Sequence, residues 1–154
     1  MPESKVHHGV KVHQGAWVVV CDGAKALVLE NVGDAKFLNL KTREVFDQPD
    51  PKTHEIGTDA PGRAISSVGT ARSAMEQTDW HDQAEQRFLQ KLANHLDTEV
   101  QAGKTKSVFL IAPPRALGVL RQSYTHALRN ALRAEIDKDF VMLPVDEIEK
   151  HLAA

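Results

Sequence analysis

A chain of 154 residues that is 42% hydrophobic and 26% charged, with a formal net charge of −2, has the size and composition of one soluble globular domain with a single core. Its apolar runs are only a few residues long, so we expect no membrane span, no signal peptide and a cytoplasmic location. The one cysteine, Cys21, rules out an internal disulfide, and its place at the end of an apolar run predicts a buried, unreactive thiol.

The first 46 residues predict a flexible arm followed by an antiparallel meander. Residues 1–15 are polar, and their three histidines have no acid or cysteine at ligand spacing, so an arm without a metal is expected there. The apolar runs Ala16–Cys21 and Ala26–Leu29 are joined by an Asp-Gly turn, which indicates a hairpin in which the glycine supplies a positive φ. A third strand is predicted between Phe37 and Phe46.

Residues 47–79 predict a mobile loop, because they contain three prolines, three glycines and no apolar periodicity. The stretch GTDAPGRA, Gly57–Ala64, comes within two substitutions of a phosphate-binding loop. However, Pro61 has no backbone N–H, Arg63 replaces the lysine, and Ala64 has no hydroxyl for magnesium. The sequence therefore predicts no bound nucleotide and no other cofactor.

The remaining residues predict alternating helices and strands, since apolar spacings of three and four alternate with short continuous apolar runs. The expected elements are a helix Trp80–Gln101 ended by Gly103, a strand Ser107–Ala112, a helix Arg115–Asp137, a strand Phe140–Val145 and a helix Asp146–Leu152. With the meander they form the order β-β-β-loop-α-β-α-β-α. This order predicts an α/β fold with a mixed five-stranded sheet in one domain over residues 16–154, and ribonuclease H-like folds share it.

Basic residues are concentrated in one segment, residues 104–133, which holds six of them and no acid. On the helix expected over Arg115–Asp137, basic side chains lie opposite the apolar face. Such a stripe suits phosphate contacts, although a solvated helix face has the same appearance. The predicted partner- or RNA-binding residues are Arg63 in the loop and Arg115, Arg121, Arg129 and Arg133 in the stripe.

A second candidate site is a polar group formed by Asp22, His81 and Glu85. Two-metal cleavage of phosphodiesters needs converging carboxylates, which Asp22 and Glu85 could begin to supply. The strand expected at Ser107–Ala112 adds no acid, so Asp22 is better interpreted as a turn residue. His81 and Glu85 lie one helical turn apart, a spacing that can hold a metal or an acid–base pair and that also arises by chance. We therefore expect no catalytic residue and no metal.

Five stretches carry a family resemblance: WVVVCDGAKALVLENVG, GRA, DQAEQRFLQKLANHL, VFLIAPPRALGVLRQ and KDFVMLPVDEIEKHL. Between Trp17 and Leu152 they resemble the bacterial host attachment proteins, described as required for attachment to host cells. That family is in turn similar to the central domain of archaeal and eukaryotic peptide-chain release factors, a ribonuclease H-like domain with a mobile loop where residues 47–79 lie. The release-factor loop carries Gly-Gly-Gln, which promotes peptidyl-tRNA hydrolysis, and this sequence has no Gly-Gly-Gln.

Three functions remain open on the sequence. The first is a non-enzymatic binding domain whose partner is the ribosome, structured RNA or a protein. The second is a translation-associated hydrolase of peptidyl-tRNA that works without Gly-Gly-Gln. The third is a metal-dependent nuclease centred on Asp22 and Glu85.

Overall fold

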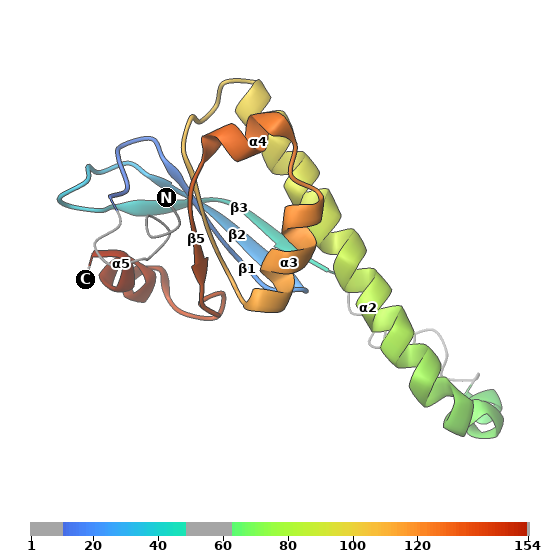
Figure 1. Ribbon diagram of the computed structural model, residues 1–154. Coiled ribbons are helices and arrows are strands. Elements are labelled where there is room, and N and C mark those ends of the chain that lie inside the picture. Colours follow the sequence, from blue (N-terminus) through green and yellow to red (C-terminus); the bar gives the residue numbers. More distant parts are fainter. Residues whose placement is uncertain (1–10, 49–62, 154) are drawn as a thin grey trace.

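The computed structural model describes residues 11–48 and 63–153, and for residues 63–81 only the backbone (Figure 1). One mixed five-stranded sheet has the strand order β3-β2-β1-β4-β5. The elements are β1 (Trp17–Cys21), β2 (Lys25–Asn31), β3 (Leu40–Asp47), α2 (Arg63–Gln101), β4 (Val108–Ala112), α3 (Pro114–Gln122), α4 (His126–Ala131), β5 (Leu132–Asp137) and α5 (Val145–Ala153). The predicted α/β class with a mixed five-stranded sheet is confirmed.

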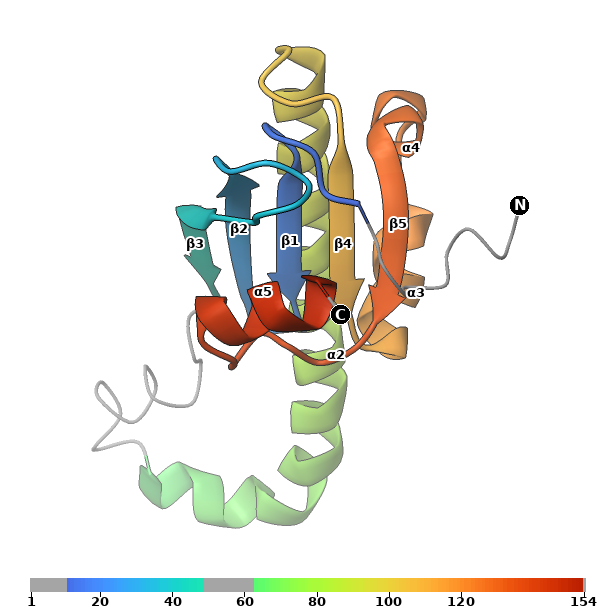
Figure 2. The ribbon, with the colours of Figure 1, turned by 90° about the vertical axis from the view of Figure 1, so that its left-hand side faces the viewer.

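Helices cover both faces of this sheet, as Figure 2 shows: α2, α3 and α4 lie on one face and α5 lies on the other. Side chains of β1 alternate between two cores. Trp17 and Val19 pack with residues of α2, whereas Val18 and Val20 pack with residues of α5. All residues of β1 and β4 are buried, which is why both strands appear in the sequence as continuous apolar runs.

The N-terminal residues 11–15 belong to the packed structure. Val12 is fully buried in the core beneath α5, and the Gly15 N–H donates to the Asn31 carbonyl at 2.8 Å. The flexible arm predicted over residues 1–15 is therefore wrong for residues 11–15. Residues 1–10 lie outside the described residues.

The turn between β2 and β3 is built around Asn31, whose side chain is fully buried. Its amide contacts the segment before β1, and its Oδ1 accepts the N–H groups of Gly33 and Asn39. Phe37 lies in this turn and is 70% exposed. The third strand therefore begins at Leu40 and not at the predicted Phe37. The polar contacts of one asparagine thus decide where the meander reverses.

α2 begins at Arg63, well before the predicted start at Trp80. The prediction of an irregular loop is therefore wrong for residues 63–79, and residues 49–62 lie outside the described residues. The first part of α2, which begins at Arg63, projects past the sheet (Figures 1 and 2). A helix that projects from the sheet needs no apolar face. The predicted end is confirmed, because Gly103 has a φ of 81° and the Lys104 N–H donates to the Glu99 carbonyl at 3.1 Å.

The single helix predicted over Arg115–Asp137 is wrong, since three elements occupy these residues. α3 ends at Gln122, and Thr125 starts the separate helix α4 by accepting a hydrogen bond from the Leu128 N–H at 3.2 Å. The apolar spacing continues across this break, because both helices pack on the same face of the sheet. Periodicity alone therefore concealed the interruption.

β5 occupies residues that the sequence assigned to a helix, and the strand predicted over Phe140–Val145 is wrong. In β5, Ala134 and Ile136 are buried and alternate with charged residues, which is the period of a strand. Residues 140–143 instead form a turn, closed by a hydrogen bond of 2.9 Å from the Leu143 N–H to the Phe140 carbonyl. The turn leads the chain to α5 on the other face of the sheet (Figure 2).

The last helix, α5, begins one residue before its predicted start at Asp146 and is amphipathic, with Ile148 and Leu152 buried. Glu149, at capping-box spacing from Asp146, has a different partner: its Oε2 accepts the N–H of Leu40 at 2.7 Å. This contact ties α5 to the first residue of the edge strand β3 and satisfies a backbone donor there.

Candidate functional site

The two ends of the sheet differ in the elements that lie there. β1, β4 and β5 are parallel, and we call the end where they start the amino end and the end where they finish the carboxyl end. α4 and the connection from α2 to β4 lie at the amino end, whereas α2 projects past the carboxyl end (Figures 1 and 2). The basic residues between positions 104 and 133 are divided between these two ends.

The four arginines predicted to form one stripe do not share a helix face. Arg115 lies in the first turn of α3 at the carboxyl end, and Arg121 lies in its last turn. Arg129 lies in the last turn of α4, and Arg133 is the second residue of β5, at the amino end. The stripe is wrong as a single surface, because it depended on one continuous helix. Each arginine is therefore assessed from its own contacts.

Arg115 forms an ion-pair cluster with two carboxylates of α2. Its Nη2 donates to Asp82 Oδ1 and lies 3.6 Å from Glu85 Oε1. The hydrogen bond to Asp82, followed by the negative charges of both carboxylates, raises the pKa of Arg115 above its ordinary value. The positive charge of Arg115 is thus already compensated by its own chain. All three side chains are substantially exposed, so this cluster contributes little stability.

Asp22 serves the turn between β1 and β2. Its Oδ1 accepts the N–H groups of Ala24 and Lys25, each at 2.8 Å, which is the local hydrogen bonding typical of aspartate in turns. The expected positive φ at Gly23 is wrong, since within the described chain only Gly15 and Gly103 have one. A Cβ at Gly23 would instead lie 2.8 Å from the side chain of Glu85.

Two of the predicted polar residues are therefore close to each other, because Glu85 of α2 packs against the turn that Asp22 begins. The side chains of His81 and Arg63 lie outside the described residues, although both belong to α2. No group of three or more metal-ligating side chains occurs among the side chains that the structure describes. Asp22, with two backbone donors on one oxygen, acts as a turn residue.

Arg121 is the second of the four predicted arginines that contacts a carboxylate. Its Nε and Nη2 donate to Glu135 Oε1 at 3.0 and 2.7 Å, and the hydroxyl of Tyr124 donates to Glu135 Oε2 at 2.7 Å. Burial, reinforced by the hydrogen bond to Glu135, raises the pKa of Tyr124. This network ties α3 and the following turn to β5, so Arg121 is mainly structural.

Arg133 is held differently, by neutral oxygen atoms at the amino end. Its Nε donates to Ser107 Oγ at 3.1 Å, its Nη1 to the Asn130 carbonyl at 3.1 Å and its Nη2 to the Lys106 carbonyl at 3.0 Å. Arg133 and Lys106 are exposed, as is Arg129 on the adjacent helix α4. None of these three cations forms an ion pair with a carboxylate among the described residues.

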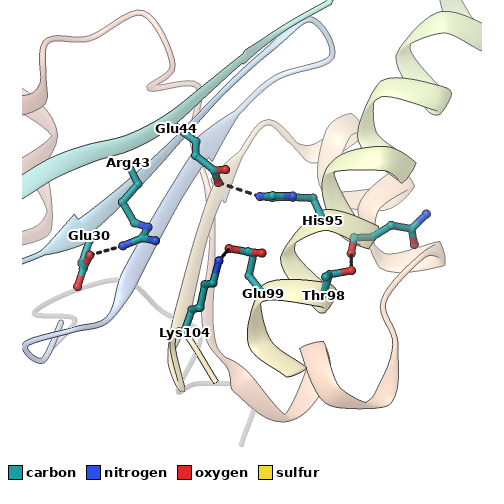
Figure 3. A network of polar contacts seen from close by, with 8 residues as sticks. Glu30, Arg43, Glu44, His95, Thr98, Glu99 and Lys104 are labelled. Carbon is teal, nitrogen blue, oxygen red and sulfur yellow. Dashed lines mark hydrogen bonds and ion pairs between the residues drawn. The ribbon is translucent and has the colours of Figure 1, made fainter. Parts of the chain in front are cut away.

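A further set of polar contacts, which the sequence did not predict, lies on α2 and the meander, and one of them joins the two (Figure 3). His95 Nε2 lies 2.8 Å from Glu44 Oε1 of β3, and Lys104 Nζ lies 3.1 Å from Glu99 Oε1. Within the meander, Arg43 pairs with Glu30 and lies over the ring of Trp17. No local motif could have revealed these pairs, because most of them join residues far apart in the sequence.

Cys21 is fully buried, and burial, followed by the nearby charge of Asp22, raises the pKa of its thiol to about 12. We expect the folded protein to resist iodoacetamide at pH 8 and the urea-unfolded protein to react at once, as measured by mass spectrometry. Rapid alkylation of the folded chain would contradict this assignment.

The same rise in the pKa of the Cys21 thiol makes the folded state lose stability as the pH rises above about 9, where the thiol of the unfolded chain ionises.

No helix within residues 11–48 and 63–153 is both long and apolar enough to cross a membrane. The profile of a protein family described as "Protein required for attachment to host cells" matches residues 17–152. The chain is also similar to "Uncharacterized protein RP470" of Rickettsia prowazekii (strain Madrid E), with 37% identity over 62 residues. That match covers 39% of this chain and 41% of the relative, so less than half of the relative's length is matched.

Proposed function

The chain belongs to the family of proteins required for attachment to host cells, and from this premise we propose that it is a non-enzymatic binding domain that associates with structured RNA, such as that of the ribosome. The family description names a biological requirement and no chemical step. The proposal therefore depends on the charges of the domain and on how they are compensated.

The observation that carries the proposal is the uncompensated charge at the amino end. Among the basic residues of positions 104–133, Arg115, Arg121 and Lys104 contact carboxylates of the same chain. Lys106 and Arg129 are exposed and have no ion-pair partner among the described residues. Exposed cations of this kind attract the phosphates of nucleic acids, and they do so without reading a base sequence.

The two enzymatic alternatives have less support. Asp22, the first carboxylate of the nuclease hypothesis, has one oxygen occupied by two backbone N–H groups, and Glu85 lies near the guanidinium of Arg115. The hydrolase hypothesis lacks the Gly-Gly-Gln motif on which release factors depend, because the sequence does not contain it. A binding role needs only the exposed cations.

Binding to purified bacterial ribosomes and to a structured ribosomal RNA fragment tests the proposal. If three cations each neutralise one phosphate, the affinity should fall about 40-fold between about 50 mM and about 200 mM salt, as measured by fluorescence anisotropy. Binding that does not change with salt would refute recognition through phosphate contacts, and no binding at the lower salt concentration would refute association with RNA. Release of a nascent chain from stalled ribosomes, with buffer as the control, would favour the hydrolase.

A further inference from the structure

We propose that Lys106, Arg129 and Arg133 form a clamp for the phosphodiester backbone of duplex RNA at the amino end of the sheet. This inference rests on the proposed function and specifies its site. We call these three residues the phosphate clamp. Arg115 and Arg121, which contact carboxylates, do not belong to it.

The geometry of Arg133 is the first reason. A guanidinium has five N–H groups, and here three of them donate to neutral oxygens at 3.0–3.1 Å, which leaves two for a ligand. These bonds hold an exposed side chain in one orientation, so little conformational entropy remains to be lost on binding. None of the three acceptors carries a negative charge, so the positive charge of Arg133 is not cancelled.

The second reason is that three basic residues from different elements lie at the same end of the sheet. Lys106 precedes β4, Arg129 lies in α4, and Arg133 lies in β5 beside the start of β4. The hydrogen bond from Arg133 to the Lys106 carbonyl brings two of them together, and the bond to the Asn130 carbonyl places the same guanidinium at the end of α4. Phosphates along a duplex backbone could be neutralised by such a group.

Two carboxylates near the end of α2, Asp97 and Glu99, have partners other than the phosphate clamp. Asp97 accepts hydrogen bonds from Thr125 and from Gln101, and Glu99 lies 3.1 Å from the amino group of Lys104. Glu99 is thus compensated by Lys104, whereas Asp97 keeps its charge because both of its donors are neutral; neither carboxylate forms an ion pair with a member of the phosphate clamp among the described residues. Lys104 therefore provides a matched control, because it lies on the same connection but is paired.

The test compares Lys106→Gln and Arg129→Gln with Lys104→Gln, using a short blunt RNA duplex and fluorescence anisotropy across a salt series. Each clamp variant should lower the affinity about eightfold at 0.1 M salt and reduce the salt slope by about 1. Lys104→Gln should stay within about twofold of the wild type, although it removes the same charge. An equal loss in all three variants would overturn the clamp, because it would indicate a diffuse charge effect.

Arg133 is tested with Arg133→Lys, which keeps the charge but replaces the planar fork by a single ammonium. We expect weaker binding than in the wild type with an unchanged far-ultraviolet circular dichroism spectrum. Arg129 is exposed and its side chain forms no ion pair among the described residues, so Arg129→Gln keeps the test independent of folding. Wild-type affinity in the double variant Lys106→Gln/Arg129→Gln would overturn the proposal.

Two further experiments distinguish an error in the proposed site from an error in the proposed function, and RNA from other partners. If the wild type binds ribosomes but the clamp variants bind them equally well, only the clamp is refuted; if the wild type binds neither ribosomes nor the duplex, the RNA function is refuted with it. A DNA duplex of the same sequence should bind with a similar salt slope, since the ligand is the phosphodiester backbone. Competition by polyglutamate as effective as that by RNA would instead indicate an acidic protein partner.

Discussion

Replacing Asn31 by aspartate is expected to lower the free energy of unfolding by about 3 kcal/mol at pH 7. The fully buried amide donates to the carbonyls of Val12, Asp34 and His13 at 2.8, 3.2 and 3.3 Å. Aspartate would keep the oxygen that accepts hydrogen bonds from Gly33 and Asn39, but it would turn a negatively charged oxygen toward three carbonyl groups. The folded state would then contain an unpaired buried charge.

The cost in Asn31→Asp should depend on pH with a definite sign. Burial would raise the pKa of the new carboxyl above its unfolded value of about 3.9, so the folded state would bind a proton at a higher pH than the unfolded state. The variant should therefore regain stability relative to the wild type as the pH falls from 7 to 5. Urea unfolding at the two pH values measures this change.

The matched control for this prediction is Asn94→Asp, because Asn94 is exposed on α2. The control should change the free energy of unfolding by less than about 0.5 kcal/mol at either pH. If Asn31→Asp were as stable as Asn94→Asp, the asparagine would not be the hub that joins the N-terminal segment to the turn after β2.

Replacing Leu110 by alanine should destabilise the fold by about 3 kcal/mol, in the range of large-to-small changes in cores. Leu110 is fully buried in β4, which lies between β1 and β5, and its side chain belongs to the core that contains the residues of α2 and α3. Rigid neighbouring strands would limit collapse around the lost side chain, so a cavity would remain. Urea unfolding monitored by circular dichroism measures the loss.

An apolar residue at the surface supplies the comparison for Leu110→Ala. Met142 is 78% exposed, so Met142→Ala should change the stability by less than about 0.5 kcal/mol. Ile148→Ala in α5 should cost about as much as Leu110→Ala, and the two losses should add, because the residues lie in cores on opposite faces of the sheet. Equal stability of Leu110→Ala and Met142→Ala would contradict the packing described here.

Prediction of the fold succeeded where an element consists of apolar residues or repeats them at helical spacing. β1 and β4 consist of buried residues and were recognised as continuous apolar runs, and α2 was recognised from Trp80 to Gln101 by its apolar spacing. It failed between Gln122 and Leu132, where the two helices α3 and α4 pack on one core and continue a single apolar spacing. It also failed at Arg63, since a projecting helix needs no apolar face.

The candidate site was predicted in part. Arg129 and Arg133 were recognised as basic residues outside the core, but Lys106 was not singled out, and Arg115 and Arg121 were grouped with them. The members of this group differ in whether they contact a carboxylate of the same chain. Glu135 contacts Arg121, and Asp82 contacts Arg115 across 33 positions of sequence, so composition and spacing held no signal of either pair.

By itself, the sequence determined the mixed five-stranded sheet, the buried central strands, the buried Cys21 and the surplus of basic residues between positions 104 and 133, because each depends on the type and order of neighbouring residues. Only the tertiary structure decided which of those cations stay uncompensated, since an ion pair depends on distances between groups that folding brings together. It also decided that Asn31 is a buried hub and that α2 projects past the sheet. Burial and projection depend on what surrounds a residue in space, which local periodicity does not encode.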